Sequence, residues 1–443
     1  MERDVTELVF PSPLLAEYRR AAWSTQHETC AVFFAYPAPH DRVLVHDGGI
    51  VPVDAYATRS EIAAQLTPAF LFEMVQQARK RRARLILSHS HAQLEDATFS
   101  VMDDLGEAAL APYLDAKLPG LEPFSALLTR SGVLGRRIGK HEAVDIVEVG
   151  STIRRHLLND PSYSAAIEEI FDRQARAFGA AGHRLIANCK VAIVGLGGTG
   201  SLVAQQLAYL GVRNFVLVDP KLLAATNRNR VVGAVAADVG LAKVDIARRM
   251  ILSVAENAQV EPICDDATRE AVLEKLAGVQ FIFLCTDSHT SRAAVSKLCY
   301  QLLIPGVDLG VNIVTSDQRI EHIVGRTQML APGLPCLWCC GAIGADAIRR
   351  ESMTQEQQAA DPYFTGQGEP QAAVISLNST MASLAVTMFL SAVARVPGQA
   401  RYQRYDGIAG TIRSITATAD ERCIVCSRYG GFARGSTRSL SLT

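Results

Sequence analysis

Apolar and polar positions change their period near residue 190, and this change organises the chain. Lys190 to Val194 is a short apolar run rich in β-branched residues, and Phe215 to Val218 is another. Between them, Thr199 to Leu210 repeats apolar residues at helical spacing. The alternation continues through a helix, a strand and a helix at 239–255, 281–284 and 288–302. Strands alternating with helices predict a parallel sheet with helices on its faces.

The first 150 residues follow a different, mixed pattern. A helical pattern lies around Pro68 to Arg82, and strand-like runs lie at 31–36, 42–46 and 85–88. Near Val149 the pattern changes, and Ser151 to Asn159 and Ser162 to Phe178 look helical, with a turn at Asp160-Pro161. We therefore expect one domain over residues 1–150, a linker over 151–164 and a second domain over 165–443.

Composition narrows the possible environments and partners. Lys and Arg number 44 against 45 Asp and Glu, and no basic run is longer than Arg79-Lys80-Arg81-Arg82, which argues against nucleic acid or an anionic membrane as the main partner. The charged N-terminus does not resemble a secretory signal. The apolar stretch from Met381 to Ala394 is shorter than the roughly 20 residues of a membrane span, so we expect a buried core helix. We expect a cytoplasmic protein, with a frayed tail from Gly430 to Thr443.

A glycine-rich loop follows the strand that ends at Val194. Its glycines are Gly195, Gly197, Gly198 and Gly200, and it opens a helix, as a phosphate-binding loop does. Asp219 ends the next strand, where a carboxylate can accept hydrogen bonds from ribose hydroxyls. An NAD(P)-dependent dehydrogenase shares these features, so the loop alone predicts only a nucleotide.

The segment after Asp219 favours a triphosphate over a dinucleotide. Arg228, Arg230 and Lys243 lie within about one helix and loop of the glycine loop, and a triphosphate that loses pyrophosphate needs such a concentration of cations. Asp287 follows another strand, at the edge of the sheet where a Mg²⁺ ligand belongs.

From about Arg173 to the C-terminus the chain resembles the ubiquitin-activating, ThiF/MoeB-type adenylyltransferases. Arg173-Gln174 with Phe178-Gly179 is similar to their Arg-Gln…Phe-Gly segment, and Asn227 and Arg230 match their Asn-x-x-Arg motif. The resemblance implies a Rossmann-like, mainly parallel sheet. It also implies that Asp219 holds ribose, that Mg²⁺ binds Asp287, and that the phosphates bind Asn227, Arg230 and Lys243. Arg173 would reach the phosphates from the other subunit of a homodimer.

Two Cys-x-x-Cys pairs lie in the same domain. Cys336 and Cys339 form the first, and Cys423 and Cys426 form the second, about 84 residues later. Two such pairs suit a closed, structural zinc site with four cysteine ligands. The six other cysteines lie in apolar runs, which fits a reducing compartment.

Many adenylyltransferases of this type carry a further cysteine that accepts the acyl group as a thioester. Residues 341–422 contain no cysteine, so Cys340 is the one nearby candidate, and we expect it to be a packing residue or a spare thiol. Adenylation without a covalent enzyme intermediate stays open. The polar segment from Ser352 to Gln371 is predicted to be a mobile loop over the acyl tail.

The N-terminal domain contains a second constellation. His89 and His91 end a strand, and Asp103 follows on the next helix, so the three can supply zinc ligands and leave a fourth position open. Glu28 precedes the strand from Ala31, where it can take a proton from bound water, and Ser100 lies on the same helix face as Asp103.

This arrangement resembles the JAMM (JAB/MPN) metallopeptidases over roughly residues 10–145. The resemblance implies an α+β, cytidine-deaminase-like domain in which His89, His91 and Asp103 bind zinc. It implies that Glu28 is the general base and that Ser100 stabilises the oxyanion. The family's usual proline after the second histidine is Ala92 here, and its Gly-rich stretch after the glutamate is Thr29-Cys30.

Together the resemblances predict a bifunctional enzyme for a ubiquitin-like protein with a Gly-ending tail. One domain adenylates the tail with ATP and Mg²⁺, and the other trims or releases it with Zn²⁺. Similar fusions are bacterial, and they imply a conjugating enzyme as a further partner and a role in antiviral defence. Two alternatives stay open: activation of a sulfur carrier for cofactor synthesis, and a non-catalytic dimeric scaffold that recruits a ubiquitin-like protein.

Overall fold

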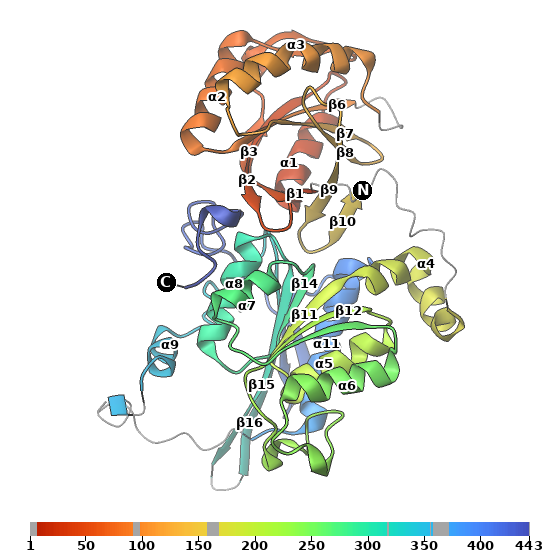
Figure 1. Ribbon diagram of the computed structural model, residues 1–443, viewed down its shortest axis with the longest axis vertical. Coiled ribbons are helices and arrows are strands. Elements are labelled where there is room, and N and C mark those ends of the chain that lie inside the picture. Colours follow the sequence, from red (N-terminus) through yellow and green to blue (C-terminus); the bar gives the residue numbers. More distant parts are fainter. Residues whose placement is uncertain are drawn as a thin grey trace. The chain divides into compact units, whose positions relative to one another are not determined.

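The computed structural model describes residues 7–91, 98–156, 168–316, 319–354, 356–357 and 372–442. It forms two compact units (Figure 1). Unit 1 comprises Met1–Pro161 together with Gly431–Arg438, and unit 2 comprises Ser162–Gly430 together with Ser439–Thr443. The expected N-terminal and C-terminal domains therefore have counterparts, but a short segment from near the C-terminus belongs to unit 1.

The described part of unit 1 contains a closed ring of seven strands with mixed directions. The ring runs in the order β1-β3-β2-β6-β7-β8-β9 and returns to β1 through the β1–β9 pairing. Its members are β1 (Glu7–Pro11), β2 (Cys30–Ala38), β3 (Arg42–Ile50), β6 (Arg84–His91), β7 (Phe124–Thr129), β8 (Val133–Arg137) and β9 (Ala143–Val149).

The structure confirms the strands expected at 31–36, 42–46 and 85–88, which belong to β2, β3 and β6. It also confirms the helix expected around Pro68 to Arg82, which is α2 (Pro68–Arg81). It corrects the helix expected over 151–159, because Ile153–His156 is strand β10, paired antiparallel with β9. Arg155 of β10 is ion-paired with Glu7 of β1 at 2.8 Å, so this segment belongs to the sheet and not to a linker. Residues 157–164 of the expected linker lie outside the described residues.

Alternation along β2 places apolar side chains on both faces of the ring. Ala31, Phe33 and Ala35 pack with helix α1 (Ser12–Trp23), which begins at Ser12-Pro13. Val32 and Phe34 pack on the other face, which is covered by α2 (Pro68–Arg81) and α3 (Val101–Lys117). Because side chains alternate along a strand, a β2 that is apolar at nearly every position predicts a sheet buried on both faces. The remaining strands, β4 (Tyr56–Arg59) and β5 (Ala64–Leu66), form a separate small hairpin.

One ion pair joins α1 to the closing strand β9. Arg19 donates to both carboxylate oxygens of Glu148, at 3.0 and 2.7 Å, and Glu148 is 4% exposed. Burial alone would raise the pKa of Glu148, but hydrogen bonds from His156 and Arg19 outweigh it and lower the pKa from 4.5 to about 2. The charged form of Glu148 therefore stabilises the folded ring.

In unit 2 an eight-stranded sheet runs in the order β13-β12-β11-β14-β15-β16-β17-β18. The strands are β11 (Lys190–Val194), β12 (Asn214–Val218), β13 (Gln259–Ile263), β14 (Phe281–Leu284), β15 (Gly306–Ser316), β16 (Arg319–Leu330), β17 (Tyr402–Asp406) and β18 (Thr411–Ser414). The pairings from β13 to β15 are parallel, and those from β15 to β18 are antiparallel. The expected strands β11, β12 and β14 are confirmed.

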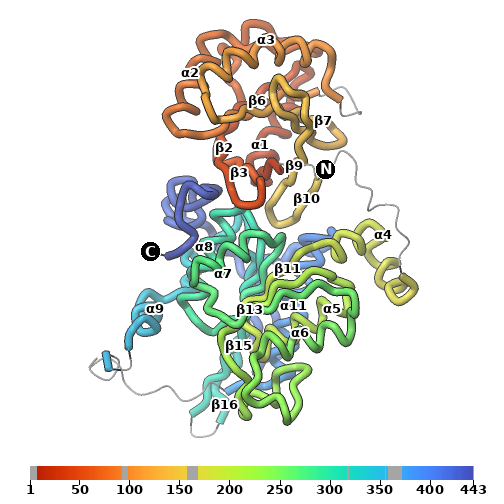
Figure 2. Tube along the Cα trace, in the orientation of Figure 1, coloured from red at the N-terminus to blue at the C-terminus, as the bar shows by residue number. Residues whose placement is uncertain are grey.

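Helices cover both faces of the parallel half of this sheet. Helix α5 (Gly198–Tyr209) packs against α6 (Lys243–Val254) and α11 (Ile375–Val393) on one face (Figure 1). Right-handed crossovers place α7 (Glu270–Leu276) and α8 (His289–Gln301) on the opposite face. Two further helices, α4 (Asp172–Asn188) and α9 (Ala345–Glu351), precede the sheet and follow β16, respectively (Figure 2).

Helix α11 corresponds to the expected core helix and is longer than the sequence pattern indicated. By length and composition alone it is apolar enough to cross a membrane. It packs, however, against α5, β15 and β16, and Met381, Ala385 and Phe389 are buried. Its apolar character is therefore accounted for by the core of unit 2.

The tail expected to fray is ordered wherever the structure describes it. In the segment that belongs to unit 1, Arg434 donates to the hydroxyl of Tyr36 at 2.9 Å, and the carbonyl of Phe432 lies 2.8 Å from Nδ1 of His46. Gly435 has φ +52°, and a Cβ there would lie 2.2 Å from the carbonyl oxygen of Pro37, so glycine permits this close approach to β2. These contacts hold the tail against β2 and β3, and its composition, rich in Gly and Ser, does not reveal them.

We predict that Glu148→Gln destabilises unit 1 in a pH-dependent way. A pKa of about 2 in the folded state against 4.5 corresponds to about 3 kcal/mol, fully present above pH 4.5 and lost as the pH falls towards 2. Urea unfolding followed by Trp23 fluorescence, in a Trp338→Phe background, measures this, because the chain contains two tryptophans. A difference in stability between the wild type and the Glu148→Gln variant that is the same at pH 7 and pH 2.5 would contradict the assignment.

Candidate functional site

The glycine loop of unit 2 connects β11 to α5 and needs glycine at defined positions. Gly195 has φ +91°, and a Cβ on Gly200 would lie 1.8 Å from the carbonyl oxygen of Gly195. The loop therefore folds tightly onto the first turn of α5. No atom of the described residues lies within 4 Å of the position that a Cβ on Gly197 would take, so this part of the chain leaves the loop open beside the α5 N-terminus, where helices bind anions.

Asp219 braces this loop. Its Oδ2 accepts the backbone N–H of Leu196 at 2.7 Å, its Oδ1 accepts that of Lys221 at 2.8 Å, and the residue is 4% exposed. The sequence correctly placed Asp219 at the end of β12. Two of the lone pairs that a ribose would use are occupied by the backbone, so binding of ribose by Asp219 stays a prediction.

Lys243 begins α6 and is buried, 7% exposed. Within the described residues its ammonium has no hydrogen-bond acceptor. Its charge acts on Asp287 without a hydrogen bond, so the ammonium is available to an anion bound at this edge of the sheet.

Asp287 follows β14, as expected, and is exposed. It lies 3.3 Å from Nζ of Lys221. Partial desolvation would raise the pKa of Asp287, but the charges of Lys221 and then Lys243 outweigh it and lower the pKa. An ionised carboxylate at this edge of the sheet is available to Mg²⁺.

Arg230 and Asn227 lie in the loop after β12. Arg230 donates to the carbonyl of Thr226 at 2.7 Å, and its Cδ would lie 3.4 Å from a Cβ on Gly198, so its stem crosses the glycine loop. Asn227 ends the short 3-10 turn Ala225–Asn227 and is partly exposed. The two motif residues are thus brought to the same loop as the glycines.

Asn378 lies at the glycine loop and was missed by the sequence analysis. It belongs to α11, is 6% exposed, and its Nδ2 lies 2.2 Å from where a Cβ on Gly198 would be. Its side chain forms no hydrogen bond with the described residues. A buried amide in an apolar helix was a signal, because such a residue requires a polar partner.

Two further predicted features are the reach of Arg173 into a second subunit and the loop that follows Glu351. Arg173 is exposed on α4, which is kinked at Phe178-Gly179, so its predicted reach into a second subunit stays a prediction. The predicted loop over 352–371 lies for the most part outside the described residues. The structure does show that Glu351, just before it, accepts hydrogen bonds from the N-terminus of α8, including the backbone N–H of His289 at 2.7 Å.

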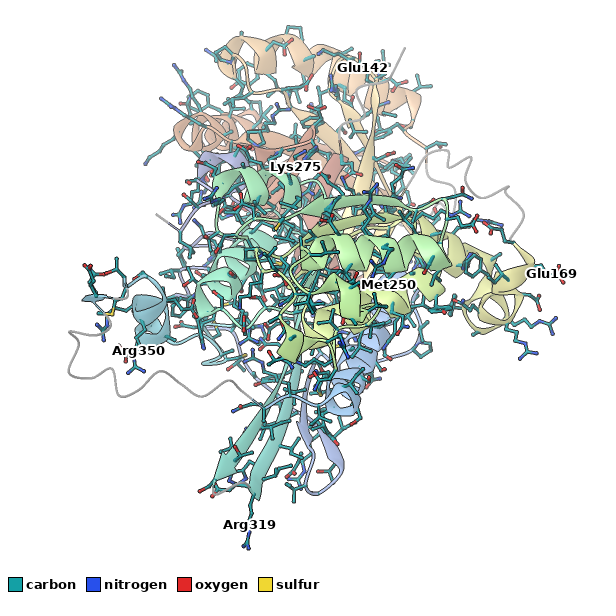
Figure 3. The ribbon with its side chains drawn as sticks, turned by 60° about the horizontal axis from the view of Figure 1, so that its bottom comes forward. Glu142, Glu169, Met250, Lys275, Arg319 and Arg350 are labelled. Atoms are coloured by element: carbon teal, nitrogen blue, oxygen red, sulfur yellow. The ribbon has the colours of Figure 1, made fainter. Side chains whose placement is uncertain are left out.

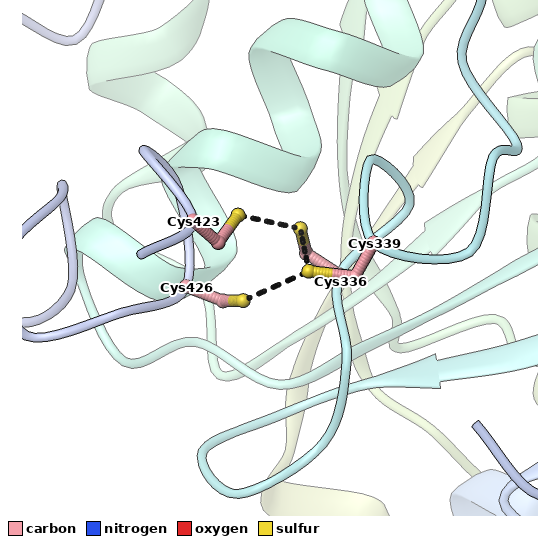
Figure 4. A group of neighbouring side chains, drawn as sticks. All are labelled: Cys336, Cys339, Cys423 and Cys426. Atoms are coloured by element: carbon pink, nitrogen blue, oxygen red, sulfur yellow. Dashed lines mark hydrogen bonds between the residues drawn. The ribbon is translucent and has the colours of Figure 1, made fainter. Parts of the chain in front are cut away.

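The four cysteines of the two pairs come together beside α8 (Figure 4). Sγ of Cys336 lies 3.7 Å from Cys339 and 3.5 Å from Cys423, and Cys339 lies 3.6 Å from Cys426. Sulfurs around a tetrahedral zinc with bonds of about 2.3 Å are about 3.8 Å apart, whereas a disulfide bond is about 2 Å. The donor set therefore fits a closed zinc site with four cysteine ligands.

Cys340 stands apart from this cluster. Its Sγ accepts a hydrogen bond from Nε2 of Gln328 at 3.2 Å. Burial raises the pKa of the Cys340 thiol, which disfavours the thiolate that a nucleophile needs. This agrees with its expected role as a packing residue.

In unit 1 the predicted zinc ligands converge at the end of β6. Nε2 of His89 lies 3.0 Å from Oδ1 of Asp103, and Nε2 of His91 lies 3.7 Å from Oδ2 of the same residue. Ligands around a tetrahedral zinc with bonds of about 2.1 Å are about 3.4 Å apart. The buried Nε2 of His89 makes no hydrogen bond of good geometry with the described residues. The three donors therefore fit zinc.

Glu28 faces the same position. Its Oε1 lies 3.6 Å from Nε2 of His91, and the residue is 6% exposed. Burial raises the pKa of Glu28 to about 7, with His89 opposing and Asp103 adding to the shift. Arg59 of β4 donates to the Glu28 carbonyl at 2.9 Å and to the Thr29 hydroxyl at 2.9 Å, which fixes the backbone at this position.

Ser100 has a clear structural role. Its hydroxyl donates to Oδ2 of Asp103 at 2.8 Å and accepts the Asp103 N–H at 3.2 Å, and its own N–H donates to the same carboxylate at 2.6 Å. This is the capping box of α3. The hydroxyl proton is directed at a zinc-ligand candidate, so its predicted action on an oxyanion stays a prediction.

Unit 2 has the fold and the phosphate-binding edge of a doubly wound nucleotide-binding protein. Residues 171–425 match the ThiF family, and the chain belongs to that family. Enzymes of this family use ATP.

Three curated relatives show how the family varies. The chain is 30% identical over 148 residues to the tRNA threonylcarbamoyladenosine dehydratase of Escherichia coli K12, covering 33% of this chain and 55% of that protein. It is 28% identical to the molybdopterin-synthase adenylyltransferase of Salmonella typhimurium LT2, covering 29% and 52%. It is 27% identical to the SAMP-activating enzyme E1 of Haloferax volcanii, covering 36% and 56%. The chain thus spans about half the length of these relatives.

We predict about two zinc ions per chain, one in each unit. Cys336→Ser with Cys423→Ser should remove one, and His91→Ala with Asp103→Ala should remove the other, measured by mass spectrometry of the desalted protein. Chelator should remove the unit 1 ion first, since an open site exchanges more readily. The control is Cys264→Ser, at an exposed cysteine outside both sites. Unchanged zinc content in either double variant would refute that site.

Proposed function

We propose that unit 2 binds ATP and adenylates the C-terminal carboxylate of a ubiquitin-like protein. A carboxylate oxygen attacks the α-phosphorus, the bond from that phosphorus to the bridging oxygen breaks, and pyrophosphate leaves. The observation that carries this proposal is Lys243, a largely buried residue whose ammonium makes no hydrogen bond with the described residues. Because the leaving pyrophosphate gains charge, a fixed cation beside it stabilises the transition state more than the bound substrate.

The other residues of the site would bind the phosphates and Mg²⁺. The glycine loop and the α5 N-terminus offer backbone N–H groups to the phosphates, while Arg230 and Asn378 both lie beside Gly198. Asp287 would hold Mg²⁺, which neutralises phosphate charge when bound. In a homodimer, Arg173 would complete the site of the neighbouring subunit.

The substrate class rests on the names of relatives and on the carboxylate chemistry. The Haloferax relative is named an E1, and the Salmonella relative is named an adenylyltransferase of molybdopterin synthase. We favour a ubiquitin-like protein with a Gly-ending tail, and a sulfur carrier of the same shape is the alternative. The proposal contains no thioester step, because burial raises the pKa of the Cys340 thiol and residues 341–422 contain no cysteine.

We predict that Lys243→Ala weakens ATP binding about 10- to 100-fold, as expected when a charged hydrogen-bond partner is removed, and abolishes pyrophosphate exchange. Asn378→Leu, of similar volume, should weaken binding less, by up to about tenfold. Isothermal titration with ATP measures binding, and exchange requires a ubiquitin-like protein ending in Gly-Gly.

The control for both variants is Lys275→Ala, since Lys275 is exposed on α7 and pairs with Glu261 (Figure 3). The melting temperature of each variant, measured beside that of the wild type, distinguishes loss of ATP binding from loss of folding. ATP affinity that is the same in Lys243→Ala and wild type would refute the assignment. A chain that binds ATP but shows no exchange with any Gly-ending protein would favour the scaffold.

We further propose that unit 1 is a zinc peptidase that trims or releases the same Gly-ending tail. The convergence of His89, His91, Asp103 and Glu28 at one position supports this. Zinc bound there would polarise the scissile carbonyl and make water more acidic. Glu28 would accept the proton from the attacking water and pass it to the leaving amine. Its Oε1 is already directed at the zinc-ligand candidates.

We predict that Glu28→Gln reduces cleavage of a linear fusion, a ubiquitin-like protein with residues added after Gly-Gly, by about 10²- to 10⁴-fold. Zinc content should stay at the wild-type value, because Glu28 is not in the ligand set. Glu17→Gln, at an exposed glutamate of α1, is the matched control. If Glu28→Gln cleaves as fast as wild type, Glu28 is not the base.

A further inference from the structure

Four arginines form one row across the antiparallel half of the unit 2 sheet. Arg326 of β16 is directly opposite Arg404 of β17, and Arg404 is directly opposite Arg413 of β18. On the other side of Arg326 the partner on β15 is Gly310, and the guanidinium of Arg292 from α8 lies over it, 3.1 Å from where a Cβ would be. We call Arg292, Arg326, Arg404 and Arg413 the arginine row.

These side chains share one face of the sheet. Residues directly opposite one another in antiparallel strands project to the same side, with Cβ atoms about 5 Å apart. Helix α11 packs on β15 and β16 from the other side, where a Cβ on Gly325 would lie 2.4 Å from the sulfur of Met381. The row therefore lies on the face opposite α11, and Arg404 and Arg413 are exposed.

The row is only partly neutralised. Asp308, fully buried, pairs with both Arg292, at 3.1 Å, and Arg326. Asp406 also lies on this face, but its carboxylate accepts the backbone N–H groups of Ile408 and Ala409 at 3.0 Å each. Within the described residues neither Arg404 nor Arg413 lies within ion-pair distance of a carboxylate, although the charge of Arg413 acts on Asp406 from farther away. Like charges directly opposite one another destabilise a sheet, so this arrangement costs stability that a structural role does not explain.

The row begins at the nucleotide edge of the sheet. Asp308 pairs in register with Leu284, three residues before Asp287. From there the guanidinium groups lead away across β16, β17 and β18. The hairpin of β15 and β16 extends beyond the row, with Arg319 near its tip (Figure 3). A protein whose terminal carboxylate lies at the nucleotide would therefore have its preceding residues near this face.

We infer that the arginine row binds acidic side chains of the protein whose C-terminal carboxylate unit 2 adenylates. The inference rests on the proposed function for its choice of partner. Guanidinium groups bind carboxylates with two parallel hydrogen bonds, and an array of them selects an acidic partner and rejects a basic one. A row with two intervening carboxylates is a poor match for a nucleic-acid backbone, which requires many cations along an extended path.

The test uses the full chain and two fluorescent peptides that end in Gly-Gly, one rich in glutamate and one with glutamine in its place. At low salt the glutamate peptide should bind about tenfold more tightly by fluorescence anisotropy, and added salt should reduce the difference. The double variant Arg404→Gln with Arg413→Gln should lose most of the difference in affinity between the two peptides. Arg248→Gln, at an exposed arginine of α6, is the matched control and should not.

Further readouts separate this inference from its rivals and from the proposed function. ATP affinity should be unchanged in the double variant, and its melting temperature should rise by about 1–2 °C as the repulsion is relieved. A raised melting temperature with unchanged peptide selectivity in the double variant would overturn the inference. Wild-type binding of single-stranded polyuridine that is tighter than binding of the glutamate peptide would also overturn it. So would loss of self-association in the double variant, because the row would then be an interface between copies of the chain. A chain that distinguishes the peptides but does not bind ATP would refute the proposed function and leave the row as an acidic-peptide site.

Discussion

The carboxylate of Asp219 is the interaction on which the nucleotide edge of unit 2 depends. It joins the first residue after Gly195 to the chain that leaves β12, so one side chain sets the positions of two loops at once. The close approach of Gly200 to the carbonyl oxygen of Gly195 further restricts the backbone conformation of the glycine loop. Lys243, Arg230 and Asn378 then approach a loop whose shape is already fixed. Preorganisation of this kind allows charges to act on phosphates without moving towards them.

Much of unit 2 was predictable because its sequence signals are local. The run from Lys190 to Val194, the glycines and the period of the following helix each specify their own geometry, and the structure has β11 and α5 at those positions. Asn378 was not predictable in the same way. Its relation to Gly198 depends on how α11 packs against α5, and no sequence period encodes contacts between segments so far apart. The same holds for the arginine row, which exists only through the register of three strands.

In unit 1 the candidate site could be predicted from the sequence, but the fold could not. The zinc-ligand candidates could be identified from their spacing. His89 and His91 are two residues apart on one strand and therefore lie on the same face, and Asp103 lies in the first turn of the next helix. The closed ring could not be identified in this way, since the parallel pairing of β1 with β9 joins residues at the two ends of the unit. The strand at Ile153–His156 was mistaken for helix for a related reason. Its conformation is imposed by pairing with β9, and four residues carry too little pattern to show it.

The segment Gly431–Arg438 has a consequence for how such a protein could have arisen. It follows the second cysteine pair of unit 2 by a few residues, yet Arg434 and Gly435 complete the surface of β2 in unit 1. Unit 1 thus comprises two separate stretches of the chain, with most of unit 2 between them. A simple joining of two reading frames would leave each unit contiguous. Exchange of unit 2 by a single recombination event would therefore also replace the segment that completes the β2 surface of unit 1.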